Sequence, residues 1–204
     1  MTRTDGPAKK MGRPRGFDEA EALHAAMKLF WERGYEGTSM ADLTKAMNLS
    51  APSIYAAFGD KKSLFGLAAK RYAEGPGQYQ ARALRESTLQ RVVRALFRNT
   101  VDFLTQPGHP SGCMTLIGAM ACSVEANSAK DLMTEIRKQN EAALKVRLQQ
   151  ARKAGELPAD LNVDDYSRYL STLLGGLAIQ AANGVTKTEM KRIEDMALRH
   201  LGYR

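Results

Sequence analysis

Apolar residues recur at helical spacing along most of the chain, and no segment shows the strict alternation of a β-strand. This recurrence predicts nine helices, separated by turns that contain glycine, proline or asparagine. Three of the helices lie before Asp60, and six follow from Asp60 onward. We therefore expect an all-α fold in which a three-helix unit precedes a six-helix unit.

Two short helices within the first unit have clear boundary signals. Ser39 and Asp42 form a capping box at the start of the first, and Asn48 suits the left-handed turn that ends it. Ser50 can cap the second helix, whose first turn tolerates Pro52. Two helices joined by so tight a connection are typical of a DNA-binding helix-turn-helix.

The second short helix, over about residues 50–58, has the composition of a recognition helix. Ile54 and Phe58 give it one apolar face, and Gly59 ends it. Small side chains at its N-terminus let the backbone approach the major groove, where the free N–H groups attract phosphate oxygens. The residues expected to face DNA are Ser50, Ala51, Pro52, Ser53 and Tyr55.

Three of the side chains in this region have suitable chemistry for DNA. Tyr55 can bind a phosphate or contact a thymine methyl, Ser53 can bond a base edge, and Lys61 supplies a positive charge for the backbone. A helical hairpin in an ordinary all-α core is the alternative interpretation. Capping, turn and charge signals agree at every step, which favours the DNA-binding one.

Three motifs cover most of the first unit: Phe30-x-x-x-Gly34-Tyr35-x-x-Thr38-Ser39-Met40, Ala46-x-x-Leu49-Ser50 and Ile54-Tyr55-x-x-Phe58-x-x-Lys61-x-x-Leu64. Together they resemble the N-terminal domain of the TetR family of bacterial repressors. The resemblance implies a homodimeric regulator whose C-terminal domain senses a small molecule and then releases the operator. It also implies phosphate contacts from Thr38 and Lys61. Ala56 and Ala57 depart from the family pattern, which is often aromatic or His there, so DNA shape is expected to carry more of the specificity.

Residues 1–16 are rich in glycine, proline and basic side chains and have almost no apolar anchor, which is typical of a mobile arm. Within them, Gly12-Arg13-Pro14-Arg15-Gly16 is similar to the arginine clamps that enter a narrow minor groove. Because the arm directly precedes the first helix, we predict that Arg13 and Arg15 bind DNA. A plain solvated tail is the alternative.

The long helix that starts at Asp60 is broken at Gly75-Pro76-Gly77. The predicted division is therefore a basic arm over 1–16, a helix-turn-helix DNA-binding domain over 17–75, and an effector-binding and dimerisation domain over 76–204.

Five helices are predicted after the break. Amphipathic patterns cover residues 89–104, 131–153 and 164–183, and a last helix is striped by Met190, Ile193, Ala197 and Leu201. Residues 113–124 are almost wholly apolar or small, so we expect a helix there that is buried on all sides. The candidate lining of an effector cavity beside it is Phe97, Val101, Met114, Ile117, Met120 and Tyr169. Simple core packing of these side chains is the alternative interpretation. If they do line a cavity, the flexible methionines favour an apolar or aromatic effector.

Small residues mark the penultimate helix as a candidate dimer face. They are Gly175, Gly176, Ala178, Ala181 and Ala182. With the last helix, two copies would form a four-helix bundle, although a contact within one chain is the alternative. Two recognition helices about one DNA turn apart would then read a pseudo-palindromic operator.

Cys113 raises a second mechanism, thiol-based sensing of an oxidant or electrophile, because a helix N-terminus favours the thiolate. An internal disulfide with Cys122 is excluded if both lie on one straight helix, since nine residues rise about 13 Å. The alternative is a small buried hydrophobe.

Composition narrows the class of protein. The 204 residues carry a net charge of +8, which favours anionic partners such as double-stranded DNA. No run of roughly eighteen apolar residues occurs and the N-terminus lacks an apolar leader, so we expect a cytoplasmic protein without membrane contact.

The chemistry-bearing residues do not form the pattern of an enzyme. The three histidines are far apart, and neither a phosphate-binding loop nor a nucleophile elbow occurs, so we expect no catalysis, no cofactor and no metal. A non-specific architectural DNA-binding protein remains an alternative, but it would not need six further helices with a possible cavity.

Overall fold

The computed structural model describes residues 17–118, 123 and 126–203, and every regular element within those residues is helical. The predicted all-α class is confirmed. None of the helices in this described part is long and apolar enough to cross a membrane.

The first three helices are α1 (Glu19–Arg33), α2 (Met40–Met47) and α3 (Ala51–Phe58). Their ends are set locally, as the sequence predicts. Ser39 and Asp42 form the capping box of α2, and Asn48 ends it with a φ of 52°. The Ser50 hydroxyl accepts from the backbone N–H of Ser53 at the start of α3. Ile54 and Leu43 are fully buried, so the apolar faces of both short helices lie in the core, where α2 packs on α1 and α3 packs between α2 and α4.

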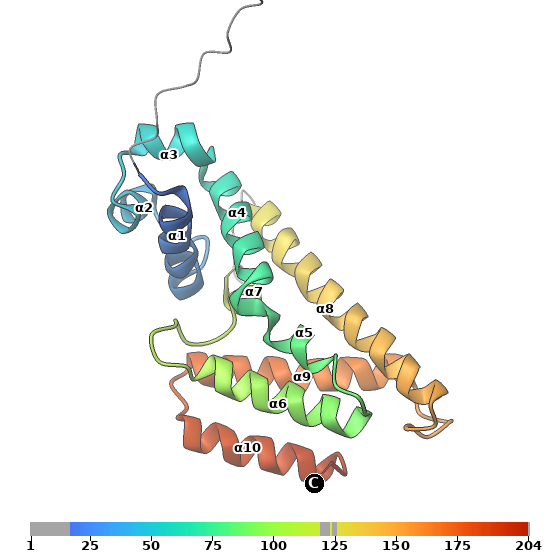
Figure 1. The fold of residues 1–204 in the computed structure, drawn as a ribbon. Helices are drawn as coiled ribbons and strands as arrows, with labels where there is room; N and C mark the ends of the chain where they lie inside the picture. Colours follow the sequence, from blue (N-terminus) through green and yellow to red (C-terminus); the bar gives the residue numbers. More distant parts are fainter. Residues whose placement is uncertain (1–16, 119–122, 124–125, 204) are drawn as a thin grey trace, which may run out of the picture.

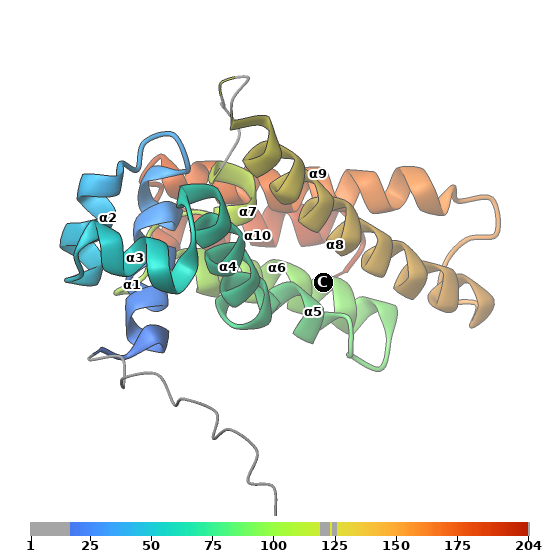
Figure 2. The ribbon, with the colours of Figure 1, turned by 90° about the horizontal axis from the view of Figure 1, so that it is seen from above.

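The remaining elements are α4 (Lys61–Glu74), a 3-10 turn at Pro76–Gln78, α5 (Tyr79–Ala83), α6 (Leu89–Leu104), α7 (Met114–Ile117), α8 (Asn127–Lys153), α9 (Val163–Ala182) and α10 (Lys187–His200). Within the described residues, eight of these helices correspond to predicted ones, and α7 covers only the start of the ninth. The helix α5 is additional because the chain resumes a helix after the break at Gly75. In Figure 1, α8 runs from beside α4 to the far end of α9, and α6 lies between α9 and α10. Figure 2 shows α1–α3 at one end of the molecule.

The prediction of one continuous helix over residues 113–124 is wrong in the described residues 113–118, and residues 119–122 and 124 lie outside the described residues. α7 ends at Ile117, which is 37% exposed, and Gly118 lies in a turn. The carbonyl of Thr115, which would accept from residue 119 in a longer helix, accepts from the Arg137 guanidinium. The carbonyl of Gly118 accepts from the backbone N–H of Tyr35 at 2.8 Å. Both bonds come from other helices or loops, so tertiary contacts override the apolar composition of this stretch.

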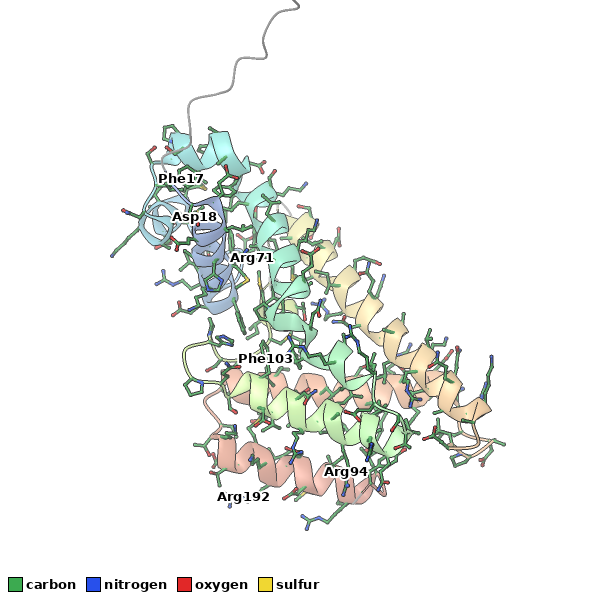
Figure 3. The ribbon with its side chains drawn as sticks, in the orientation of Figure 1. Phe17, Asp18, Arg71, Arg94, Phe103 and Arg192 are labelled. Atoms are coloured by element: carbon green, nitrogen blue, oxygen red, sulfur yellow. The ribbon has the colours of Figure 1, made fainter. Side chains whose placement is uncertain are left out.

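An aromatic cluster joins the first three helices to the rest of the protein. The Trp31 ring lies 4.9 Å from that of Tyr72 on α4 and 5.5 Å from that of Phe103 on α6. Figure 3 places Phe103 at the lower end of α1, where α4 turns toward α5. The Phe103 ring also stacks on Tyr79 of α5 at 4.3 Å. This geometry fixes α1, α4, α5 and α6 around a common core.

Candidate DNA interface and effector cavity

The outward face of α3 is exposed at the end of the molecule farthest from α10 (Figure 1). Tyr55 is 51% exposed, and Ser50 and Pro52 are exposed as well. Ala51 and Ser53 are half-buried, while Ile54 and Phe58 on the opposite face lie in the core. The structure thus brings together the five residues predicted to face DNA, on a helix with an open N-terminus.

The N-terminus of α3 combines hydroxyl groups with free backbone donors. The Ser50 and Ser53 hydroxyl oxygens lie 2.8 Å apart, so one donates to the other. A serine hydroxyl has one donor and two acceptor sites, which leaves capacity for a base edge or a phosphate. This end of α3 can therefore bind DNA without losing its cap.

Thr38 does not fit the phosphate contact implied by the family resemblance. Its side chain is fully buried, and its hydroxyl donates to the Gly34 carbonyl at 2.7 Å. The hydroxyl stabilises the loop between α1 and α2 and is not accessible to a phosphate.

Lys61 begins α4, and its Nζ lies 4.3 Å from the centre of the Tyr35 ring. This cation–π contact holds the ammonium on the side of α1, so its phosphate contact stays a prediction. Arg13 and Arg15 lie outside the described residues, and their minor-groove contact also stays a prediction.

A cavity of about 630 Å³ lies between α4, α5, α8 and α9, within the size range of small-molecule sites. Its polar wall residues include Thr115, Thr134, Asn140, Ser171 and Thr172. Its apolar wall includes Leu84, Leu96, Leu116, Ile136, Leu144 and Leu174.

None of the described residues predicted to line an effector cavity lies on the wall of this one. Phe97, Val101 and Met114 are buried in the protein core, and Ile117 and Tyr169 are exposed elsewhere. Helical periodicity identifies a buried face, but it does not tell whether that face meets other side chains or an empty space. Met120 lies outside the described residues.

Cys113 lies on the wall of this cavity, where Tyr72 and Tyr79 also contribute. The Cys113 sulfur accepts from the Tyr72 hydroxyl at 3.5 Å and lies 3.0 Å from the Thr115 hydroxyl oxygen. Burial raises the pKa of both Tyr72 and Tyr79, and the nearby sulfur raises it further. Both phenols therefore stay protonated and act as hydrogen-bond donors. Cys122 lies outside the described residues, so its relation to Cys113 is untested.

Gly175 and Gly176 of α9, predicted on a dimer face, are among the cavity wall residues, and Gly176 is exposed. Ala178 and Ala181 are buried in the chain's own core and present no side chain to a second subunit, whereas Ala182 is exposed and its contact stays a prediction. Exposed apolar side chains remain on the last two helices, at Ile179, Ile193 and Met196. These side chains give α9 and α10 an apolar surface that sequence reasoning did not identify residue by residue.

One short segment, residues 112–118, contacts both the cavity and α1. The Trp31 indole N–H donates to the Gly112 carbonyl at 2.9 Å, and the Tyr35 backbone N–H donates to that of Gly118. Between these two bonds, Cys113, Thr115 and Leu116 line the cavity. The segment therefore links the interior of the C-terminal part to the helix that supports α2 and α3.

Two family models match most of the chain. Residues 22–68 match the bacterial regulatory proteins of the tetR family, and residues 88–195 match the tetracyclin repressor-like C-terminal domain. The second match alone spans more than half of the chain.

Full-length relatives agree with these matches. The HTH-type transcriptional repressor ComR of Escherichia coli is 30% identical, over 94% of this chain and 92% of its own length. The uncharacterized HTH-type transcriptional regulator YezE of Bacillus subtilis is also 30% identical, over 91% and 95%. A solved structure of a cysteine mutant of the TetR family regulator CifR, complexed with operator DNA, has a TM-score of 0.88 and 34% identity over 92% of this chain and 98% of that one. This chain therefore belongs to the TetR family of bacterial transcriptional regulators.

Proposed function

We propose that the protein is a homodimeric repressor that binds a pseudo-palindromic operator through α3 and releases it when a small molecule occupies the cavity. The observation that carries this proposal is the exposed face of α3, with Tyr55 at its centre and small residues at its N-terminus. The similarity to known proteins supports it, since ComR is a transcriptional repressor and the CifR mutant is complexed with operator DNA.

Dimerisation follows from the size of the recognition helix. A single helix of two turns buries too little surface to hold an operator tightly, whereas two copies about 34 Å apart combine their contacts. The apolar side chains of Ile179, Ile193 and Met196 make α9 and α10 the proposed dimer face.

We propose that release travels through residues 112–118. A ligand that displaces Cys113, Thr115 or Leu116 must also strain the hydrogen bonds at Gly112 and Gly118, because the segment is short. Those bonds hold α1, so the ligand changes the position of α3 relative to the C-terminal domain. This chain is similar over nearly its whole length to one bound to operator, which supports reading the present arrangement as DNA-competent.

We assign the protein no catalytic role, and we place it in the cytoplasm because a regulator of this family acts on chromosomal DNA. A repressor needs binding and a conformational response rather than reacting groups.

The test is competition binding at fixed salt between the protein's own promoter region and random duplex, with Tyr55→Phe and Tyr55→Ala as variants. We expect the wild-type protein to bind the promoter more tightly than random duplex. Tyr55→Phe should weaken promoter binding modestly, and Tyr55→Ala should weaken it by roughly 10- to 100-fold. Thermal unfolding and dimer mass serve as controls, since Tyr55 is exposed. Equal affinity for promoter and random duplex would favour the architectural alternative.

Thiol sensing at Cys113 is a second candidate, favoured by the position of its sulfur on the cavity wall beside the Tyr72 hydroxyl. An electrophile in the cavity would then modify the sulfur instead of binding reversibly. Release of operator by N-ethylmaleimide that persists in Cys113→Ser would dispose of this mechanism.

A further inference from the structure

The charged residues of the cavity wall are mostly cationic. Arg137 and Lys138 of α8 and Arg168 of α9 contribute positive charge, whereas Glu141 is the sole carboxylate among the described wall residues. Arg168 lies 3.7 Å from Glu141, so these two largely neutralise each other. Arg137 and Lys138 leave the described wall with an excess of two positive charges.

Arg137 is the better placed of the two to hold a ligand. Its side chain is partly buried, and its guanidinium donates to the Thr115 carbonyl and, at 2.7 Å, to the Thr134 hydroxyl. Both acceptors are neutral, and within the described residues no carboxylate lies at ion-pair distance. A guanidinium has five N–H donors, so several remain for a further acceptor. A partly buried cation without a counter-ion is stabilised by an anion that completes its hydrogen bonds.

Other residues of the wall are apolar. Leu96 of α6, Leu144 of α8 and Leu174 of α9 are buried side chains that face the cavity, and the Tyr72 ring closes it toward α4. Such a surface gains free energy when it covers a hydrocarbon or aromatic group. The cavity therefore combines an apolar region with one cationic edge.

We infer that the effector is an amphipathic organic anion, whose carboxylate or similar acidic group binds Arg137 and Lys138 and whose apolar body covers the leucines. This inference rests on the proposed function, because it names the ligand class of the same cavity. Like charge on the wall disfavours cationic amphiphiles of equal size.

Isothermal titration of the full-length, DNA-free protein tests the inference with probes that share a carbon skeleton. The probes are phenylbutyrate, phenylbutanol and phenylbutylamine, and likewise decanoate, decanol and decylamine. We expect at least one acid to bind about tenfold or more tightly than its alcohol, and its amine to bind weakest.

Four variants assign the preference to the cationic edge. Arg137→Gln should reduce it most, Lys138→Gln should reduce it partly, and Arg137→Lys should retain much of it because the charge remains. Lys130→Gln removes an exposed cation of the same helix that does not line the cavity, so it should bind the acids as wild type does. The Tm of Arg137→Gln and Arg137→Lys is measured as well. A loss of Tm shared by both variants reports the missing bond to the Thr115 carbonyl, whereas a loss of acid binding in Arg137→Gln alone reports the missing charge.

Tighter binding of the alcohols or amines would overturn the inference, as would binding of neither acid at millimolar concentration. An unchanged acid preference in Arg137→Gln and Lys138→Gln would overturn it too. Operator binding is measured separately without probe, so failure of the ligand class leaves operator recognition intact, and failure of operator recognition is seen before any probe is added.

Discussion

Substitution of Trp31 by phenylalanine isolates the contact between α1 and the segment 112–118. Trp31 is almost fully buried, and its indole N–H donates to the Gly112 carbonyl at 2.9 Å. Phenylalanine keeps an aromatic ring against Tyr72 and Phe103 but has no donor. The variant therefore removes one hydrogen bond between the DNA-binding domain and the cavity wall while it preserves most of the packing.

The loss of stability in Trp31→Phe has two contributions. An unsatisfied buried carbonyl costs about 1–3 kcal/mol, and the smaller ring leaves a void that costs roughly 1 kcal/mol more. The free energy of unfolding should thus fall by about 2–4 kcal/mol, which lowers the Tm by roughly 4–16 °C for a chain of this size. Natural domains are stable by about 5–15 kcal/mol, so the variant is expected to stay folded at room temperature.

The decisive measurement is operator affinity below the Tm. If the bond holds the DNA-competent arrangement, Trp31→Phe should weaken operator binding by roughly 5- to 30-fold, the equivalent of 1–2 kcal/mol. Phe103→Leu is the matched control, because it removes a ring stacked on Trp31 and leaves the bond to Gly112 in place. Both variants should lose stability, and Trp31→Phe should lose more operator affinity. Equal operator affinities would mean that Trp31 contributes packing alone and that coupling does not pass through Gly112.

Two other predictions test single elements. Hydrogen bonds from the Ser39 hydroxyl and backbone N–H, together with the nearby Arg33, hold the pKa of Asp42 below its usual range. The ionised Asp42 therefore stabilises the folded protein fully above about pH 4, and this stabilisation is lost as the pH falls through the lowered pKa. Asp42→Asn should accordingly lower the Tm at neutral pH and flatten its fall in acid, and a Tm–pH curve parallel to wild type would contradict this role. Gly176→Ala should raise the free energy of unfolding by up to about 1 kcal/mol, because no atom lies within 4 Å of the added Cβ and alanine favours a helix. The same methyl group enters the cavity wall, so phenylbutyrate should bind less tightly, whereas Gly66→Ala on α4 should bring the stability without the loss of binding.

Local sequence signals were sufficient to predict the helix-turn-helix. The caps at Ser39, Asn48 and Ser50 act on neighbouring backbone groups, so the sequence determines both the boundaries of α2 and α3 and the outward face of α3. Thr38 was misjudged because its hydroxyl bonds to Gly34, which the resemblance to the family does not reveal.

The cavity could not be predicted in the same way. Periodicity separates buried from exposed positions, and it correctly marks Phe97 and Val101 as buried. These two side chains pack in the core and do not line the cavity. The cavity wall includes polar residues such as Thr134 and Asn140, which a helical pattern assigns to solvent. Only the relative placement of α4, α8 and α9 makes these side chains face one another. The place of Gly175 and Gly176 on the cavity wall could not be predicted either, because small residues permit close approach of either a helix or a ligand.

The same hydrogen bonds explain the early end of α7 and the proposed coupling between the cavity and α1. The Thr115 and Gly118 carbonyls accept from Arg137 and Tyr35, and α7 ends at Ile117. A longer helix would satisfy its own carbonyls and could move as a unit without disturbing α1. Because the segment accepts from donors of α1 and α8, an anion bound to the remaining Arg137 donors is expected, in the proposed mechanism, to shift the guanidinium and weaken its bond to the Thr115 carbonyl. We expect the change to pass through residues 116–118 to the Tyr35 backbone N–H, which lies three residues before Thr38 and five before Met40, the first residue of α2.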